Sequence, residues 1–201
     1  MKQFLVTDFK YHHLPAMSFE LKTYQIMGLS GASGSGKTLL LRALADLDEN
    51  EGCVQLDGLE KNKIAAPEWR KKISLLSAES QWWFDTVGEH FDLTHADKLK
   101  IDCKAVGFSA DVMSWTVSRL SSGEKQRLAL LRSLQNKPEI LLLDEPTANL
   151  DANNTDLFEV AIKNYLQKEA AAAIWVSHDN VQLERVCDMR YQINNGQLEL
   201  C

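Results

Sequence analysis

Gly31-Ala32-Ser33-Gly34-Ser35-Gly36-Lys37-Thr38 is a run in which three glycines precede a lysine and a threonine. Glycine adopts the positive φ angles that let a loop curl until several backbone N–H groups converge on one anion. The G-x-x-x-x-G-K-[ST] spacing is that of the Walker A loop, whose lysine reaches the β- and γ-phosphates and whose threonine hydroxyl binds Mg²⁺. All eight residues are therefore predicted to bind a nucleotide, and Thr38 also to bind the metal.

The segments on either side of this loop support the prediction. Residues 26–29 are apolar and predict a short strand, and residues 39–44 predict a helix. The motif requires this strand-loop-helix order, and a helix that begins at the loop directs its positive end at the bound anion. An ordinary Gly/Ser loop is the less favoured alternative. Taken alone, the motif is shared by kinases, GTPases and motor ATPases.

Composition narrows the class of protein further. With 201 residues, 45% of them hydrophobic, residues 1–201 are predicted to form a single domain with a buried core. No apolar run approaches the roughly 20 residues of a membrane-spanning helix, and the first residues lack a secretory signal, so a cytoplasmic location is expected. The four cysteines show no C-x-x-C spacing and are predicted to be reduced.

The net charge of −6 argues against broad contact with nucleic acid or anionic lipid. No nucleic-acid partner is therefore expected, and contact with the membrane is expected only through a protein partner.

Periodicity predicts a mixed α/β architecture. Apolar and polar residues alternate over the first thirty positions, as in short antiparallel strands, and about 87–118 predict a small helical lobe. Farther on, a helix at 124–134, a strand at 140–143, a helix at 152–168, a strand at 174–176 and a helix from 181 predict a parallel sheet flanked by helices. Residues 170–173 fit either helix or strand. Asn194-Asn195-Gly196 predicts a hairpin turn.

An apolar strand at 140–143 ends in two acidic residues, Asp144 and Glu145. Open α/β sheets bind their ligands at the carboxyl ends of their strands. Asp144 is suited to hold Mg²⁺ as a Walker B acid, and Glu145 to orient and polarise an attacking water. A solvated Asp-Glu turn is the alternative, and the glycine-rich loop makes it the less favoured one.

The run Leu120-Ser121-Ser122-Gly123-Glu124-Lys125-Gln126-Arg127 resembles the signature motif of ABC-type ATPases. The other family motifs stand in the family order, with a D-loop at 148–151 and a switch segment at 176–179. The resemblance covers the whole chain. It implies an ABC-type P-loop NTPase fold: a mostly parallel core sheet flanked by helices, an N-terminal antiparallel β subdomain and a small helical lobe.

The resemblance also implies roles for residues in this chain. Ser121 and Gly123 are expected to contact the γ-phosphate of ATP bound to the other subunit of a head-to-tail dimer, although the same residues alone predict only a helix N-cap. His178 is expected to hydrogen-bond the γ-phosphate. Tyr11 is expected to stack on adenine, with Phe9 and His12 as competing neighbours.

Three positions depart from the family pattern: Ala78 stands for the Q-loop glutamine, Ser122 for a signature glycine and Glu124 for a signature glutamine. We expect Ala78 to slow ATP turnover without abolishing it, unless Glu79 or Gln81 reaches inward in its place. Ser122 and Glu124 are expected to be harmless. The aromatic run 82–84 follows the Q-loop, where ABC ATPases receive a helix of their membrane subunit. Trp82 or Trp83 is predicted to line a groove for that partner, with packing under the helical lobe as the alternative.

These observations predict an ATP-hydrolysing subunit of an ABC transporter with ATP and Mg²⁺ as ligands. It is expected to form a homodimer or pseudo-dimer around two ATP, and to drive a separate transmembrane permease from the inner face of the cell membrane. One alternative is a soluble ABC-type ATPase that acts on nucleic acid or ribosomes. Another, motivated by Ala78, is a regulatory ATP-binding module that hydrolyses weakly.

Overall fold

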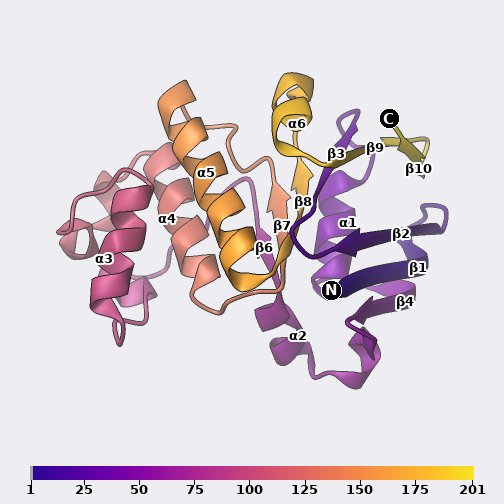
Figure 1. The fold of residues 1–201 in the computed structure, drawn as a ribbon, viewed down its shortest axis with the longest axis horizontal. Helices are drawn as coiled ribbons and strands as arrows, with labels where there is room; N and C mark the ends of the chain where they lie inside the picture. The colour runs from indigo at the N-terminus through magenta and orange to yellow at the C-terminus, as the bar shows by residue number, and fades with distance from the viewer. Residues whose placement is uncertain (1) are drawn as a thin grey trace.

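The computed structural model describes residues 2–201, which form a six-stranded core sheet, a four-stranded antiparallel sheet and helices around them (Figure 1). The core strands are ordered β10-β9-β3-β8-β7-β6, and they are parallel from β9 to β6. The mostly parallel core sheet is thus confirmed. Its strands are β3 (Ile26–Gly31), β6 (Ile73–Leu76), β7 (Ile140–Asp144), β8 (Ala172–Val176), β9 (Met189–Asn194) and β10 (Gln197–Leu200).

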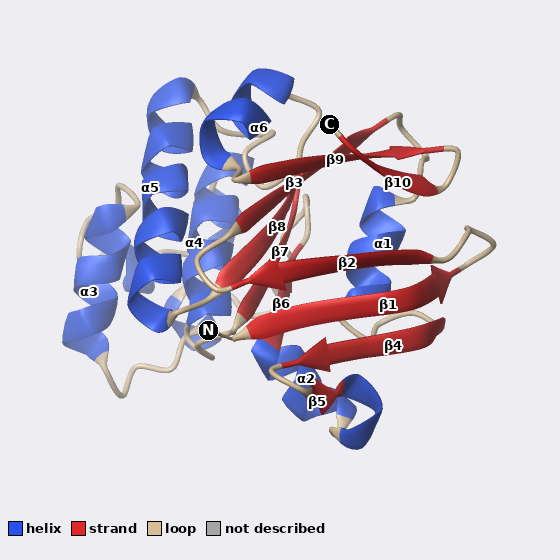
Figure 2. Cartoon of the chain, turned by 45° about the vertical axis from the view of Figure 1, so that its right-hand side comes forward, coloured by secondary structure: helices blue, strands red, loops and turns tan. Residues whose placement is uncertain are grey.

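The antiparallel sheet is built almost entirely from the first sixty residues (Figure 2). Its strands are β1 (Gln3–Tyr11), β2 (Met17–Lys22), β4 (Asn50–Leu56) and the two-residue β5 (Leu59–Glu60), in the order β2-β1-β4-β5. Alternate residues of β2 are buried, as the sequence pattern predicts for a half-exposed sheet. The predicted N-terminal antiparallel subdomain is confirmed.

Helices cover both faces of the core sheet. On one face, Leu142 and Ile174 pack with α1 (Lys37–Leu44) and the antiparallel sheet. On the other face, Leu143 and Trp175 pack with α4 (Ser122–Leu134), α5 (Ala152–Glu169) and α6 (Asn180–Val186). Because adjacent residues of a strand point to opposite faces, these strands are apolar throughout, and each buried leucine contributes about 1.5–3 kcal/mol.

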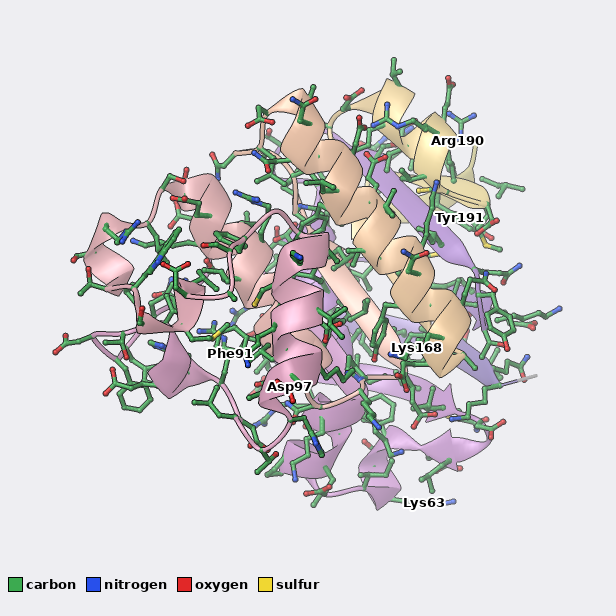
Figure 3. The ribbon with its side chains drawn as sticks, turned by 60° about the vertical axis from the view of Figure 1, so that its left-hand side comes forward. Lys63, Phe91, Asp97, Lys168, Arg190 and Tyr191 are labelled. Carbon is green, nitrogen blue, oxygen red and sulfur yellow. The ribbon has the colours of Figure 1, made fainter. Side chains whose placement is uncertain are left out.

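The segment at 87–118 contains less helix than its pattern predicts. Its α-helix is α3 (Ala96–Ala105), and three 3₁₀ turns occupy Gly88–His90, Val112–Ser114 and Val117–Arg119. Gly107 ends the α-helical stretch with a φ of 84°. Buried apolar residues nevertheless join this segment to α4, including Val87, Leu99 and Leu128. Figure 3 shows α3 in front, with Asp97 at its start and Lys168 on the neighbouring α5.

Backbone geometry decides whether residues 170–173 belong to a helix or a strand, and it agrees with the predicted hairpin turn. Ala170 takes a left-handed φ of 51° and ends α5, so β8 begins at Ala172. Asn195 and Gly196 have φ angles of 48° and 78°, as a type I′ hairpin turn requires. The predicted hairpin is confirmed. A seven-residue helix, α2 (Ala66–Lys72), links the antiparallel sheet to β6.

Candidate nucleotide-binding site

The glycine-rich loop connects β3 to α1, as predicted, and its glycines are sterically required. Gly31, Gly34 and Gly36 have φ angles of 146°, 78° and 98°. A Cβ atom on Gly31 would lie 2.8 Å from the Ile193 carbonyl oxygen, and one on Gly36 would lie 2.5 Å from Leu14 Cδ1. The loop is therefore curled against β9 below it, with its backbone free to face an anion.

Lys37 is the first residue of α1, and its side chain reaches back into this loop. Its side chain is 7% exposed, and Nζ donates hydrogen bonds to the carbonyl oxygens of Gly31 at 2.8 Å and Ala32 at 3.0 Å. Burial lowers the pKa of Lys37, and the negative charges of Glu145 and Asp144 oppose that shift. The ammonium group is thus held where a polyphosphate would be wrapped by the loop.

Thr38 and Asp144 bring two oxygen donors together. The Thr38 hydroxyl donates a 2.8 Å hydrogen bond to Asp144 Oδ2, and Asp144 is 5% exposed. Mg²⁺ prefers oxygen ligands and takes one or two protein groups together with phosphate oxygens and water. Within residues 2–201 no cluster of three or more His, Cys, Asp or Glu side chains is arranged for a metal. The Thr38–Asp144 pair fits the kind of Mg²⁺ site in which the substrate supplies further ligands.

Glu145 and His178 follow adjacent parallel strands, with Asp144 of β7 opposite Val176 of β8. The backbone N–H of His178 donates to Glu145 Oε2 at 3.4 Å, and His178 Nε2 lies 3.6 Å from Glu145 Oε1. Burial raises the pKa of Glu145, and the charge of His178 opposes that rise. Oε1 is buried without a hydrogen-bond partner among the described residues. Such a carboxylate is suited to accept a proton from a bound water.

Tyr11 is placed differently from its predicted role. It is 1% exposed, its ring centroid lies 6.0 Å from that of Phe9, and its hydroxyl lies beneath Gly36. Burial raises the pKa of Tyr11 to about 12. Stacking of adenine on Tyr11 does not fit this placement, because no ring face is open to a base. Of its competing neighbours, Phe9 is buried and His12 is exposed.

Ser121 and Gly123 open α4. Ser121 Oγ accepts from Glu124 N at 3.2 Å, while Glu124 Oε2 accepts from the N–H and the hydroxyl of Ser121, both at 2.8 Å. This reciprocal pair is a capping box, and the backbone hydrogen bond from Ser121 lowers the pKa of Glu124. A Cβ on Gly123 would lie 2.8 Å from the Asn149 carbonyl oxygen, so the signature packs against the D-loop.

The predicted site residues therefore fall into two groups. Lys37, Thr38, Asp144, Glu145 and His178 gather at the carboxyl ends of the core strands: Thr38 bonds Asp144, His178 bonds Glu145, and the charges of both acids act on Lys37. Ser121 and Gly123 belong to α4, which packs on the opposite face of that sheet from α1, with the core strands between the two helices (Figure 2).

The Q-loop begins directly after β6. Because Leu76 pairs with Leu143, residues 77–78 follow alongside Asp144 and Glu145. Gln126 of α4, which is 2% exposed, donates a 2.8 Å hydrogen bond to the Ser77 carbonyl oxygen. Glu79 and Gln81 are exposed, so neither replaces the glutamine missing at Ala78 in this arrangement.

The aromatic run after the Q-loop surrounds His90. The rings of Trp82, Trp83 and Phe84 lie 4.7, 4.9 and 5.1 Å from the His90 ring. His90 Nε2 accepts from the backbone N–H groups of Trp83 and Phe84, each at 3.0 Å. Trp83 is 64% exposed and Phe84 48%, whereas Trp82 is partly buried. An exposed tryptophan is thus present where a partner groove is predicted.

Sequence reasoning missed three polar residues that support these groups: Gln126, His90 and Gln182. Each is buried and hydrogen-bonds a loop at the site or beside it. The sequence holds one clue to these three residues: Gln182 stands four positions after His178, at the start of the helix that follows it.

The comparisons with known proteins agree with this geometry. The ABC transporter family profile matches residues 14–148. The chain is 29% identical over 205 residues to the methionine import ATP-binding protein MetN of Helicobacter acinonychis, covering 94% of this chain and 62% of that protein. It is 30% identical over 195 residues to ABC transporter I family member 17 of Arabidopsis thaliana, covering 92% and 74%. The chain thus spans less than two thirds of the MetN protein.

The fold is also found in a solved structure of a bacterial Atm1-family ABC exporter with ATP bound. The TM-score is 0.87 at 21% identity, over 98% of this chain and 38% of that one. Within residues 2–201, no helix combines the length and the apolar character needed to cross a membrane. The glycine-rich loop, the Asp144–Glu145 pair and the matched profile lead to one conclusion: the chain belongs to the ABC transporter family, as an ATP-binding domain.

Proposed function

We propose that this chain hydrolyses ATP, that two copies close around two ATP molecules, and that the cycle drives a separate transmembrane permease. The observation that carries the proposal is the convergence of the glycine-rich loop after β3 with the two acids after β7, where the Thr38 hydroxyl donates a 2.8 Å hydrogen bond to Asp144 and Glu145 follows directly. The charges of both acids are close enough to influence the pKa of Lys37. An anion-binding loop beside a half-buried carboxylate is what hydrolysis of a phosphoanhydride needs.

Each residue has a distinct task in the proposed reaction. Lys37 and the N–H groups of the loop hold the β- and γ-phosphates, while Thr38 and Asp144 hold Mg²⁺, which when bound neutralises phosphate charge. Glu145 accepts a proton from a water whose oxygen bonds to the γ-phosphorus. The bond from that phosphorus to the β–γ bridging oxygen breaks, and ADP and phosphate leave. His178 orients Glu145 and hydrogen-bonds a γ-phosphate oxygen.

The signature residues support a site shared between two copies. Ser121 is exposed at the start of α4, where a helix N-terminus favours an anion. Its helix lies across the core sheet from the glycine-rich loop of the same chain. A second copy placed head-to-tail would bring its Ser121 and Gly123 to the γ-phosphate held by Lys37.

A permease partner is supported by the exposed aromatic pair Trp83 and Phe84 and by the transport role in the name of MetN. Large exposed aromatic side chains are frequent anchors at protein interfaces. We therefore place the chain at the inner face of the cell membrane, attached through that partner alone.

The proposal is tested by ATP hydrolysis in wild type, Glu145→Gln and the control Glu199→Gln, which changes an exposed glutamate on β10. We expect wild type and the control to release phosphate at equal rates. Glu145→Gln should bind ATP and release phosphate at least about a hundredfold more slowly, as general-base loss predicts. A wild type no faster than Glu145→Gln would contradict hydrolysis and leave the regulatory, weakly hydrolysing module suggested by Ala78.

A further inference from the structure

The switch histidine lies directly before a short helix whose start is fixed by its own cap. Asp179 Oδ1 accepts from the backbone N–H groups of Val181 at 2.9 Å and Gln182 at 3.1 Å. The helix, α6, has only seven residues. His178 therefore directly precedes the capping residue of α6.

One side chain of α6 connects this helix to the segment after Glu145. Gln182 is 3% exposed, and its Nε2 donates to the Thr147 hydroxyl oxygen at 2.9 Å. Thr147 stands two residues beyond Glu145, in a turn closed by a hydrogen bond from Ala148 N to the Glu145 carbonyl oxygen. Gln182 thus joins the two loops that carry His178 and Glu145.

The same amide group is anchored on α5. Gln182 Nε2 also donates to Glu159 Oε1 at 2.9 Å, and Glu159 is 6% exposed. Arg185, one turn farther along α6, donates to both Glu159 oxygens, at 2.7 and 3.1 Å. The buried carboxylate is therefore paired, which offsets the large cost of burying an ion.

The two hydrogen bonds donated at position 182 require the side-chain amide of glutamine. An amide nitrogen carries two hydrogens, and here one is used by Thr147 and the other by Glu159. Glutamate at this position would face Glu159 with no hydrogen to donate, and leucine would leave the partly buried Thr147 hydroxyl and the buried Glu159 carboxylate with fewer partners. The Glu145 side chain meets His178 only through long contacts, at 3.4 Å and 3.6 Å. The pairing of β7 with β8 holds the two backbones on one side, and Gln182 adds a second link through Thr147.

We propose that Gln182 is a positioning residue that fixes the separation of Glu145 and His178 through Thr147 and Glu159. This inference rests on the proposed ATP hydrolysis for its kinetic consequence, but its structural consequence is independent of that reaction. Displacement of a catalytic group by about 1 Å from remote changes can cost about a hundredfold in rate. Gln182 therefore affects the chemical step and leaves ATP binding alone.

The test compares Gln182→Leu, Gln182→Glu and the exchange variant Gln182→Glu/Glu159→Gln, with Gln167→Leu as the control at an exposed site on α5. We expect each single change at 182 to lower kcat about tenfold to a hundredfold, with the KM for ATP within about twofold of wild type. The exchange variant restores a donor opposite an acceptor but removes the carboxylate that Arg185 pairs with, so it should recover part of the rate lost in Gln182→Glu. Gln167→Leu should match wild type.

Amide hydrogen exchange of residues 177–181 in nucleotide-free protein gives a second readout. It should accelerate in Gln182→Leu and Gln182→Glu and return toward the wild-type rate in the exchange variant. The positioning role would be overturned if the single variants exchanged their amide hydrogens at the wild-type rate. It would also be overturned if the double variant exchanged them as fast as Gln182→Glu does. If exchange follows this pattern while wild type fails to hydrolyse ATP, the proposed function fails and the positioning of His178 stands.

Discussion

Glu145 combines an unusual backbone conformation with a half-buried carboxylate. Its φ is 46°, a left-handed angle that costs a residue with a Cβ about 1–2 kcal/mol. Such strain persists where the surroundings fix the conformation, and it is concentrated at functional sites. Here β7 and β8 fix the chain on one side, through the hydrogen bond from Glu145 N to the Val176 carbonyl oxygen. The side chain is thereby directed toward His178 instead of solvent.

The pKa of Glu145 predicts a pH-dependent effect of its removal. Burial is the main cause that raises the pKa of Glu145 above 4.5. The folded state therefore binds the proton of this carboxyl more tightly than the unfolded chain does. Stability from this group is present below the unfolded pKa and is lost as pH rises from 4.5 through the raised folded pKa. Glu145→Gln, which stays neutral, should thus raise the Tm relative to wild type more at about pH 7 than at about pH 4. Thermal unfolding at both pH values measures this, and an equal Tm difference would contradict it.

Ala78 lies where the register of β6 and β7 brings it beside the end of the Walker B strand. A glutamine at this position can add an amide oxygen near the Thr38–Asp144 pair, where Mg²⁺ is proposed to bind. Ala78→Gln should therefore raise kcat for ATP hydrolysis several-fold, about 1 kcal/mol in barrier. Ala78→Leu is the control, since it adds similar bulk with no oxygen donor. Equal rates for the two variants would show that the missing amide has no role.

At the scale of elements, the start of α4 depends on its capping box. Glu124→Ala removes the acceptor of the Ser121 N–H and hydroxyl, and should lower the free energy of unfolding by about 0.5–1 kcal/mol. Glu124→Gln keeps an oxygen acceptor and should lose less. Urea unfolding of the two variants measures the difference, and equal stabilities would mean that the Glu124 acceptor contributes nothing to the helix.

The elements also show what the sequence can predict. The strand and helix around the glycine-rich loop, the apolar strand before Asp144 and the Asn-Gly hairpin follow local patterns, and all are found. The secondary structure of residues 87–118 was harder to predict, because their polar, helix-like pattern is interrupted by Gly88 and Gly107. A Cβ on Gly88 would lie 2.8 Å from the Met113 carbonyl oxygen, a contact that depends on tertiary packing. No local pattern reports that contact.

The site residues also fall into those that the sequence could predict and those that it could not. Lys37, Thr38, Asp144 and Glu145 belong to motifs whose spacing fixes their geometry, so their contacts could be predicted. Burial of Tyr11 could not, because it depends on how β1 and Leu14 pack below Gly36. Gln182 was equally inaccessible: its role arises from Thr147 and Glu159, which are 35 and 23 residues away in sequence.

At the scale of the whole molecule, the exposed aromatic pair after the Q-loop predicts a permease contact. Trp83→Ala should reduce copurification of this chain with a membrane protein about tenfold or more, as removal of a central aromatic anchor does. Ile101→Ala, at a 68% exposed position on α3, is the matched control and should copurify as wild type does. Equal retention of the two variants would place the partner elsewhere on the surface.

The arrangement of the two faces of the core sheet supports the proposal that the glycine-rich loop is half of a site that a second copy completes. The glycine-rich loop and its helix α1 pack on one face of the core sheet, while Ser121 and Gly123 open a helix on the other. Ser121→Asp separates nucleotide binding from assembly. Aspartate keeps an N-cap acceptor for Glu124 N, although it removes the hydroxyl donor to the Glu124 carboxylate. It also places a negative charge where the partner's γ-phosphate is proposed to lie.

The decisive measurement is the mass in solution of Glu145→Gln, by analytical ultracentrifugation with and without ATP and Mg²⁺. We expect a dimer only when ATP is present, and a monomer that still binds ATP when Ser121→Asp is added. A monomer at saturating ATP, or a dimer that Ser121→Asp leaves intact, would contradict a site shared between two copies.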